Sequence, residues 1–331
     1  MASPVQGEVN VPKCQHRLIR LQPGTYLDHN MDEISFSDFI NKELILFSMA
    51  DNIRSIPSVA DGLKPGQRKV IWGCFKRKLK KEIKVAQLVG YISEVAAYHH
   101  GEASLTMTIV NLAQDYVGSN NLNLLLPNGQ YGTRDIGGKD HASARYIFTE
   151  LAPMTRTLFN PDDGPLLTYL KEDNDWIEPE YYMPIIPMVL VNGAEGIGTG
   201  EHHFEYTTMV AGSGSIGWST NIPCYNPEDI VTNLRRLMAG EEMVPMLPWW
   251  RGFKGTIRKV GEHKYDVVGV VSKINDTTVE VTELPIHKWT QSYKAELEGM
   301  IGEKGDGVIK VRYPSTSVPV QIIQGGWRTG L

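Results

Sequence analysis

Twenty residues of this chain, Gly132–Leu151, read GTRDIGGKDHASARYIFTEL. They contain a glycine pair, three Lys or Arg side chains and one tyrosine, Tyr146, which directly follows Arg145. The glycines before the tyrosine indicate a loop that another molecule can approach closely. Most Tyr–Arg neighbours in proteins pack or lie along the surface, so the pair alone establishes no site. Its meaning depends on motifs elsewhere in the chain.

Length and composition are those of a globular protein. The 331 residues are enough for two domains, and 41% of them are hydrophobic and 21% charged. We find no apolar run long enough to cross a membrane and no N-terminal cleavage pattern, so we expect no membrane partner. The three cysteines, Cys14, Cys74 and Cys224, are far apart, which argues against a disulfide framework or a zinc site and favours a reducing compartment.

Charge is distributed unevenly along the chain. Nine basic residues and one acid, Glu82, lie between Lys64 and Lys84, a local balance of +8 within a chain of net charge −5. Such a block is typical of a surface that binds a polyanion. A solvated helix face is the alternative interpretation.

The spacing of apolar residues predicts several helices ahead of the glycine-rich segment 132–151. We expect a helix from Phe36 to Met49 with Ser37 as its N-cap, ending before Pro57. Further helices are expected from Pro65, over residues 86–97, and from Glu102 to about Val117 with Gly118 as the C-cap. Short extended runs around the turn Pro127-Asn128-Gly129 follow. Helices followed by a small β-ribbon predict a winged helix, with Tyr146 in or beside the wing.

The second half has a different pattern. The run 183–191 is predicted to be a buried strand, and residues 255–257, 265–271 and 278–282 are predicted strands, with a helix over 229–238. We therefore expect a mixed α/β (α+β) chain. Its parts are an irregular lead-in over residues 1–30, a winged-helix domain over 31–181, an α/β domain over 182–310 and a tail over 311–331. A G-x-G-x-x-G match beginning at Gly212 is rejected, because no convincing strand precedes it and Pro223 blocks the required helix.

Tyr146 could act as a nucleophile on a phosphodiester if other residues assist it. A phenol has a pKa of about 10 and needs help at neutral pH. Guanidinium groups would hold the phosphate and an imidazole would handle the proton, which makes Arg145, Arg54 and His100 the candidates. A histidine on a turn is more often structural, and Arg54 could be an ordinary helix-end cation.

A second candidate is the segment NGAEGIGTG at residues 192–200. Ile197 lies between Gly196 and Gly198. An apolar side chain presented in this way can wedge between base pairs and kink a duplex. The alternative is that Ile197 simply closes the end of a strand.

Five motifs in this order resemble one family. They are ELILFSMADNIRSIPSVADGLKPGQRKV, AYHHGE, LLLPNGQYGTRDIGGKD, ARYIFTEL and VNGAEGIGTG. Together they resemble the DNA-gate region, the winged helix and the following tower domain, of eukaryotic topoisomerase II, a type IIA DNA topoisomerase. The resemblance covers roughly residues 21–307. It implies that Tyr146 forms a 5′-phosphotyrosyl link to DNA, that Arg145 stabilises the transition state, and that Arg54 and His100 complete the site.

The resemblance also implies DNA contacts, cofactors and partners. Ile197 would be the intercalating wedge, and the expected contacts to the DNA backbone are Lys64, Arg68, Lys69, His99 and Gln114. Double-stranded DNA, a homodimer and a nuclear location are implied. Mg²⁺ and ATP are implied for the full-length enzyme, both bound by regions absent from this chain, so we expect the chain alone to be inactive in strand passage.

Some segments depart from the family pattern. Residues 1–16 and 311–331 do not resemble it, and residues 201–217 interrupt a junction that the family writes without a break. Our hypothesis is that the insert and the tail are retained introns or gene-model errors, which sequencing of the mature transcript tests. Two alternatives stay open: a DNA-binding module without chemistry of its own, and a bacterial-type protein similar to the gyrase A polypeptide.

Overall fold

The computed structural model describes residues 33–172, 174–198, 219–262, 264–276, 278–300, 309–312 and 320–324. Two compact units are distinguished, residues 1–52 with 198–218 and residues 53–197 with 219–331. The boundary expected between residues 181 and 182 falls inside the second unit. The lead-in over 1–30, the insert 201–217 and the glycine motif at Gly212 lie outside the described residues. Within the described ranges, no helix has the length and apolarity needed to span a bilayer.

The described part of the first unit is helical, but it is not one uniform helix. A short α-helix, α2 (Phe36–Asp38), continues as a π-helical segment, η1 (Phe39–Leu44), and then as α3 (Ile45–Ser55), whose last residues enter the second unit. The N-cap is Ser35 and not the expected Ser37, because the Ser35 hydroxyl accepts a hydrogen bond from the Asp38 amide at 3.0 Å. As expected, α3 ends before Pro57.

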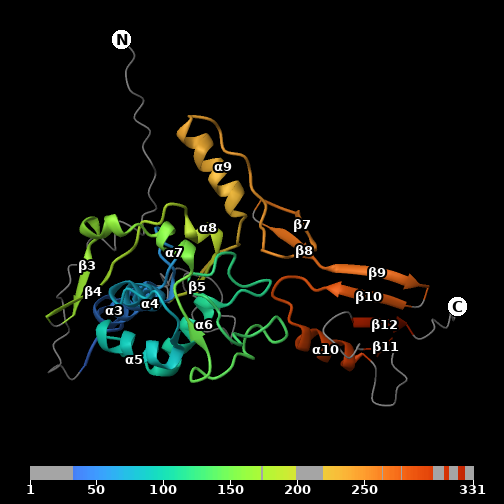
Figure 1. The fold of residues 1–331 in the computed structure, drawn as a ribbon, viewed down its shortest axis with the longest axis horizontal. Coiled ribbons are helices and arrows are strands. Elements are labelled where there is room, and N and C mark those ends of the chain that lie inside the picture. The colour runs from blue at the N-terminus through green and yellow to red at the C-terminus, as the bar shows by residue number, and fades with distance from the viewer. Residues whose placement is uncertain are drawn as a thin grey trace, which may run out of the picture. The chain divides into compact units, whose positions relative to one another are not determined.

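Three helices form the core of the second unit: α4 (Pro65–Lys76), α5 (Val85–Val95) and α6 (Glu102–Ala113). They gather in one group in Figure 1. Gly73 allows α4 to approach α5, because a Cβ there would lie 2.8 Å from Ile92. The predicted start of a helix at Pro65 is confirmed, and α5 agrees with the predicted range within two residues. The apolar spacing therefore located these helices correctly.

The predicted end of α6 near Val117 was wrong. The helix ends at Ala113, and Gln114 adopts an extended backbone with φ −57° and ψ 138°. The side-chain amide of Asn120 donates to the carbonyls of Asn111 and Gln114 at 2.7 and 2.9 Å, so an asparagine satisfies the helix end instead of Gly118.

The expected wing is present. Strand β1 (Ile83–Lys84) pairs antiparallel with β2 (Phe148–Thr149), and isolated bridges join Leu125 to Leu151 and Asn128 to Phe148. Three helices with this ribbon make the predicted winged-helix arrangement.

The segment after the wing is folded back on α4. It consists of α7 (Pro153–Leu158), the 3₁₀ helix η2 (Pro161–Leu166) and the hairpin β3 (Tyr169–Glu172) and β4 (Asp175–Pro179). The strand predicted over 183–191 is wrong, since this region ends in a short helix, α8 (Met188–Val191). Pro184 and Pro187 lack the N–H groups that a strand ladder needs, and Pro187 precedes the helix at its N-cap.

The remaining elements include the predicted strands and helix. They are β5 (Ala194–Ile197), β6 (Ser219–Ile222), α9 (Pro227–Met238), β7 (Thr256–Lys259), β8 (Tyr265–Val268), β9 (Val270–Asn275), β10 (Thr278–Glu283), α10 (Thr290–Gly299), β11 (Ile309–Arg312) and β12 (Val320–Gln324). An antiparallel sheet has the order β11-β12-β10-β9 (Figure 1). Strand β11 includes residue 310 and strand β12 lies after it. The folded sheet therefore continues past the expected boundary at residue 310.

Candidate active site

Tyr146 is presented outward by the turn and strand that hold it. Its side chain is 76% exposed, whereas the next residue, Ile147, is 1% exposed. The amide of Tyr146 donates to the Ser143 carbonyl at 2.9 Å, and the amide of Val85 donates to the Ile147 carbonyl at 3.0 Å. Successive side chains of an extended segment point to opposite faces, so the burial of Ile147 fixes the phenol on the solvent side.

A second tyrosine near the wing has a structural role. Tyr131 is 3% exposed, and its hydroxyl donates to the Phe148 carbonyl at 2.6 Å. Burial raises the pKa of Tyr131 to about 12. Only Tyr146 of these two therefore has a hydroxyl accessible to another molecule.

The loop Thr133–Asp140, which leads toward Tyr146, is closed on itself. The Asp140 carboxylate accepts hydrogen bonds from the Thr133 amide at 2.8 Å and the Thr133 hydroxyl at 2.5 Å. Burial by itself raises the pKa of Asp140, but the hydrogen bonds from Thr133 outweigh it and the net pKa is lowered. Gly132 and Gly138 have positive φ, and a Cβ on Gly132 would lie 2.4 Å from the Gly138 carbonyl oxygen. The glycines thus serve contacts within the loop.

Gln114 holds this loop from beneath. It is 5% exposed, and its side-chain amide donates to the carbonyls of Tyr131 and Gly138 at 2.9 and 3.1 Å. The sequence suggested a DNA-backbone contact here. The structure instead gives the Gln114 amide two internal partners.

Arg68 also departs from its expected role. Its guanidinium donates twice to the Asp61 carboxylate, at 2.7 and 3.0 Å, and both side chains are buried. The same carboxylate accepts from the amides of Leu63 and Tyr182. A direct phosphate contact by Arg68 stays a prediction, and it would require breaking this buried ion pair, which would leave Asp61 uncompensated.

Lys69 is largely enclosed as well. Its ammonium donates to the Ala96 carbonyl and to the Glu178 carboxylate, the latter at 2.9 Å. Burial raises the pKa of Glu178, and the hydrogen bond from Lys69 opposes that shift. Lys69 therefore ties α4 to β4.

Four other predicted site residues are exposed: Arg54, His99, His100 and Arg145. The His99 imidazole lies 3.0 Å from the Glu172 carboxylate, and the His100 ring makes an edge contact with Tyr98 at 5.6 Å. Lys64 is partly exposed and begins α4. Arg145 adjoins Tyr146 in the chain. Among the described residues, no hydrogen bond or ring contact joins the Tyr146 side chain to His100.

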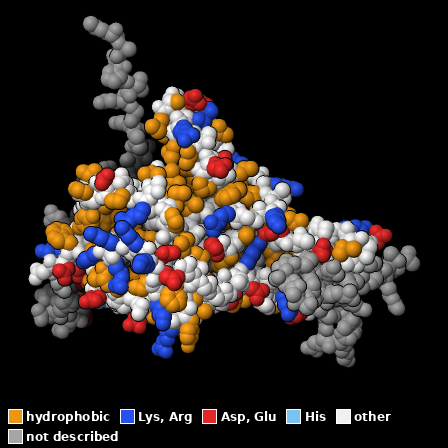
Figure 2. Space-filling model, in the orientation of Figure 1, with side chains coloured by type: hydrophobic (Ala, Val, Ile, Leu, Met, Phe, Trp, Pro, Cys, Tyr) orange, Lys and Arg blue, Asp and Glu red, His pale blue; other side chains and the backbone are white. Residues whose placement is uncertain are grey.

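The basic block divides into a buried and an exposed part. Arg68 and Lys69 face inward, whereas the cations that follow are exposed: Lys76, Arg77, Lys78, Lys80, Lys81 and Lys84. Figure 2 shows Lys and Arg side chains gathered over this part of the surface. The Lys84 ammonium lies 5.8 Å from the ring of Phe148, the second residue after Tyr146 in the chain. The exposed cationic surface therefore reaches the short strand that follows the tyrosine.

Ile197 is exposed at the end of β5, as a wedge requires. Its side chain is 69% exposed, and its backbone pairs with Ser219 of β6. The flanking glycines face the protein. A Cβ on Gly196 would lie 2.3 Å from the Ser55 carbonyl oxygen, and one on Gly198 would lie 2.0 Å from the Asn52 side chain.

Sequence reasoning missed the contacts between the Thr133–Asp140 loop and the later part of the chain. Arg134 is bound to the Glu283 carboxylate and to the carbonyls of Leu284 and Pro285. Gln291 binds Asp135 through both its backbone amide and its side chain, each at 3.0 Å. No local pattern marks pairs about 150 residues apart in the chain.

The described residues do not form a metal centre. Within the ranges that the structure describes, no group of three or more His, Cys, Asp or Glu side chains could hold a metal ion. The Mg²⁺ that the resemblance implies thus finds no such group in the described part of the chain.

Comparison with known proteins identifies the family. The model of DNA gyrase/topoisomerase IV, A-subunit, matches residues 54–204 and 208–323, and the C-terminal associated domain of TOPRIM matches residues 8–52. The motifs predicted a resemblance over residues 21–307. The second match begins earlier, at residue 8, and the first match ends later, at residue 323.

The similar proteins are much longer than this chain. DNA topoisomerase 2 of Candida albicans is 56% identical over 289 residues, which are 87% of this chain and 19% of that protein. DNA topoisomerase 2 of Arabidopsis thaliana is 58% identical over 287 residues, 86% of this chain and 18% of that protein. The chain therefore spans about a fifth of their length.

A solved structure agrees with these relatives. The DNA-binding, cleavage and re-ligation domain of Plasmodium falciparum topoisomerase II superposes with a TM-score of 0.79 at 45% identity, covering 96% of this chain and 42% of that one. The relatives named here are eukaryotic, which disfavours the bacterial alternative similar to gyrase A. With 267 of its 331 residues matched, the chain belongs to the family of DNA gyrase/topoisomerase IV A-subunits, and within it the chain is similar to the eukaryotic topoisomerase 2 members.

Proposed function

We propose that this chain is the DNA cleavage and religation part of a type II DNA topoisomerase, which changes DNA topology through a transient double-strand break. The observation that carries the proposal is Tyr146, a tyrosine 76% exposed in the turn just before strand β2 and directly after Arg145. The family membership gives this arrangement its chemical meaning.

The proposed reaction is a transesterification. The Tyr146 hydroxyl oxygen attacks a DNA phosphorus, the Tyr–O–P bond forms, and the bond from phosphorus to the 3′ oxygen breaks. The phenol proton passes to His100 or to water, and the departing 3′ oxygen takes up a proton. Arg145 and Arg54 stabilise the charge on the equatorial oxygens. The reverse step reseals the strand without external energy, because the ester is retained as phosphotyrosine.

Residues around the tyrosine are proposed to hold and bend the duplex. Lys64, His99 and the exposed cations from Lys76 to Lys84 contact the backbone, and Ile197 wedges between base pairs. Arg68, Lys69 and Gln114 support these surfaces from within. In the whole enzyme we propose a nuclear homodimer, with ATP driving strand passage and Mg²⁺ serving the cleavage step.

The test is a covalent trap. The chain is mixed with duplex DNA, Mg²⁺ and a separately expressed metal-binding domain of a relative, and then denatured so that any protein–DNA ester survives. We expect an adduct from the parent chain and from Tyr181→Phe, which alters another exposed tyrosine, and none from Tyr146→Phe. An adduct that persists in Tyr146→Phe would refute the proposed nucleophile.

The second candidate function is a DNA-binding module without chemistry of its own. The exposed cations from Lys76 to Lys84 favour it, because they can hold a phosphate backbone without any bond being made or broken. Under this alternative no variant forms an adduct, while duplex binding remains and weakens steeply with salt. Measuring the salt dependence of binding beside the trap therefore separates the two functions.

A further inference from the structure

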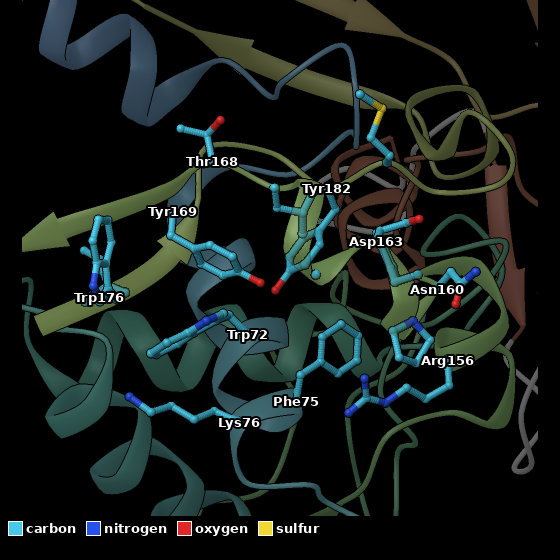
Figure 3. Close-up of a pocket in the computed structure, with 16 residues that line it drawn as sticks. Trp72, Phe75, Lys76, Arg156, Asn160, Asp163, Thr168, Tyr169, Trp176 and Tyr182 are labelled. Atoms are coloured by element: carbon cyan, nitrogen blue, oxygen red, sulfur yellow. The ribbon is translucent and has the colours of Figure 1, made fainter.

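A cavity of about 920 Å³ lies in the second unit, and its lining does not include Tyr146, Arg145, Arg54 or His100. Its walls come from α4, from α7 and η2, from the β3–β4 hairpin and from the segment around Tyr182 (Figure 3). This volume is in the range of small-molecule sites, which are about 300–1,000 Å³. Of the residues proposed to act on DNA, Lys76 is the one that also lines this cavity.

Six aromatic side chains contribute to the walls. Phe75, Phe159 and Tyr182 form a contiguous group with ring centroids 5.3–6.2 Å apart. Three further rings surround the space in Figure 3: Trp72, Tyr169 and Trp176. Walls of this kind bind flat aromatic molecules by stacking and by edge contacts.

One polar group in the wall has no partner. The Tyr182 hydroxyl is buried with no hydrogen bond in the structure, and the residue is only 6% exposed. In Figure 3 this hydroxyl points toward the space between Tyr182 and Tyr169. An unsatisfied buried hydroxyl costs free energy, and a ligand acceptor atom would remove that cost. Because the cavity wall contains an unsatisfied hydrogen-bond donor, the cavity favours a ligand that carries an acceptor atom.

Two cations lie over the rings. The Arg156 guanidinium is 3.8 Å from the Phe75 centroid, and the Lys76 ammonium is 4.5 Å from the Trp72 centroid. Burial lowers the pKa of Arg156, which shows that its charge is partly withdrawn from water. Asp163 is the one acidic residue in the described lining.

These charges decide which ligand fits best. A cationic ligand would have to displace Arg156 or Lys76 from ring faces that they already occupy. A neutral aromatic would leave the two cations without a counter-charge. A planar aromatic anion satisfies the rings, the cations and the Tyr182 donor together.

We infer that this cavity is a binding site for a flat aromatic anion, such as an aromatic carboxylate, sulfonate or phosphate. The ring walls hold the aromatic body, Arg156 and Lys76 pair with the anionic group, and the Tyr182 hydroxyl donates to an acceptor atom of the ligand.

A matched pair of dyes tests the inference on the 331-residue chain. 8-Anilinonaphthalene-1-sulfonate is a planar aromatic anion, and N-phenyl-1-naphthylamine is the same ring system without the sulfonate. Fluorescence titration is combined with equilibrium dialysis to obtain the stoichiometry. We expect one saturable site that binds the sulfonate at least about tenfold more tightly than the neutral dye, since one charge-assisted hydrogen bond is worth about that factor.

Variants locate the site. Arg156→Gln and Lys76→Gln should each weaken sulfonate binding about three- to tenfold with little change for the neutral dye. Tyr182→Phe should weaken binding of the sulfonate while leaving the thermal midpoint unchanged or higher. Lys76 is exposed, so its variant folds even if Arg156→Gln does not. Arg77→Gln, which removes an arginine stacked 4.7 Å from Tyr91 and outside the cavity lining, is the control and should leave the affinity for both dyes unchanged.

Each remaining outcome overturns the inference. No saturable sulfonate binding shows that the cavity takes no aromatic anion. Equal affinity for the two dyes shows that the cations do not select charge. Sulfonate binding that is unaffected by Arg156→Gln, Lys76→Gln and Tyr182→Phe places the dye elsewhere on the chain.

Discussion

Single residues proposed to act on DNA divide into those that face the solvent and those that are enclosed. Tyr146, Arg145 and His100 are exposed, whereas Gln114 is buried and supports the loop that precedes the tyrosine. The resemblance assigned Tyr146, Arg145 and His100 to cleavage and Gln114 to a backbone contact, but it could not separate exposed from buried residues. Burial depends on contacts from distant segments, and a single residue type such as Gln or Arg serves either role.

Asp140 offers a test at this scale. Asp140→Ala removes the acceptor for the Thr133 amide and hydroxyl, and we expect the free energy of unfolding at pH 7 to fall by about 1–2 kcal/mol, after allowing for solvent screening. Urea unfolding measures it. Asp115→Ala, at an exposed position, should have little effect.

The difference in the free energy of unfolding between the parent chain and Asp140→Ala has a predictable pH dependence. The pKa of Asp140 is lowered in the folded state. Its contribution to the free energy of unfolding is therefore present when the pH is above the ordinary pKa of 3.8, and it is lost as the pH falls through the folded-state pKa. The difference between the parent and Asp140→Ala should therefore shrink below about pH 3.8. A difference that stays constant down to about pH 3 would contradict the assigned hydrogen bonds.

Elements were predicted well where their signals are local. The apolar spacing and Pro65 located α4, and the strand predicted over 278–282 coincides with β10 within one residue. The two errors have different causes. The Asn120 side chain ends α6 early through hydrogen bonds that leave no periodicity in the sequence. Pro184 and Pro187 lack the N–H groups that a strand ladder needs, so an apolar run whose composition favours a strand forms a loop and a short helix.

Strand β5 gives a test at the scale of elements. Gly196→Ala would bring a Cβ to 2.3 Å from the Ser55 carbonyl oxygen, so we expect a loss of about 1–3 kcal/mol in the free energy of unfolding as the strand and the end of α3 move apart. Thermal and urea unfolding measure this loss.

Gly90 supplies the matched control. It lies on the exposed face of α5 with no atom within 4 Å of a Cβ, so Gly90→Ala should stabilise the protein by about 0.5–1 kcal/mol. Equal effects of the two substitutions would show that the close approach at Gly196 does not matter for stability.

At the scale of the whole molecule, the Thr133–Asp140 loop is tied to residues 283–291. Arg134 and Asp135 make the polar contacts, and a Cβ on Gly137 would lie 2.6 Å from the Trp289 ring. The order of the two regions along the chain could be predicted from composition and motifs. Their connection could not, because it joins positions about 150 residues apart.

Glu283→Ala tests this connection. Removing the carboxylate leaves the partly buried Arg134 guanidinium without its charged partner, and we expect local opening to become at least about tenfold more frequent. Hydrogen exchange should then quicken at the amides of Gly138 and Gln291. Asp276→Ala, which removes an exposed ion pair with Lys273, is the control. Unchanged exchange in Glu283→Ala would show that the loop is held without this ion pair.

The position of β12 between β11 and β10 has a practical consequence for anyone shortening this protein. A chain cut at residue 310 would strip β10 of its neighbour on one side and leave a row of unpaired amides and carbonyls open to water. Uncovered rows of this kind recruit strands from other molecules, so such a truncation should precipitate or form mixed aggregates during expression. A cut placed after Gln324 would keep that row covered.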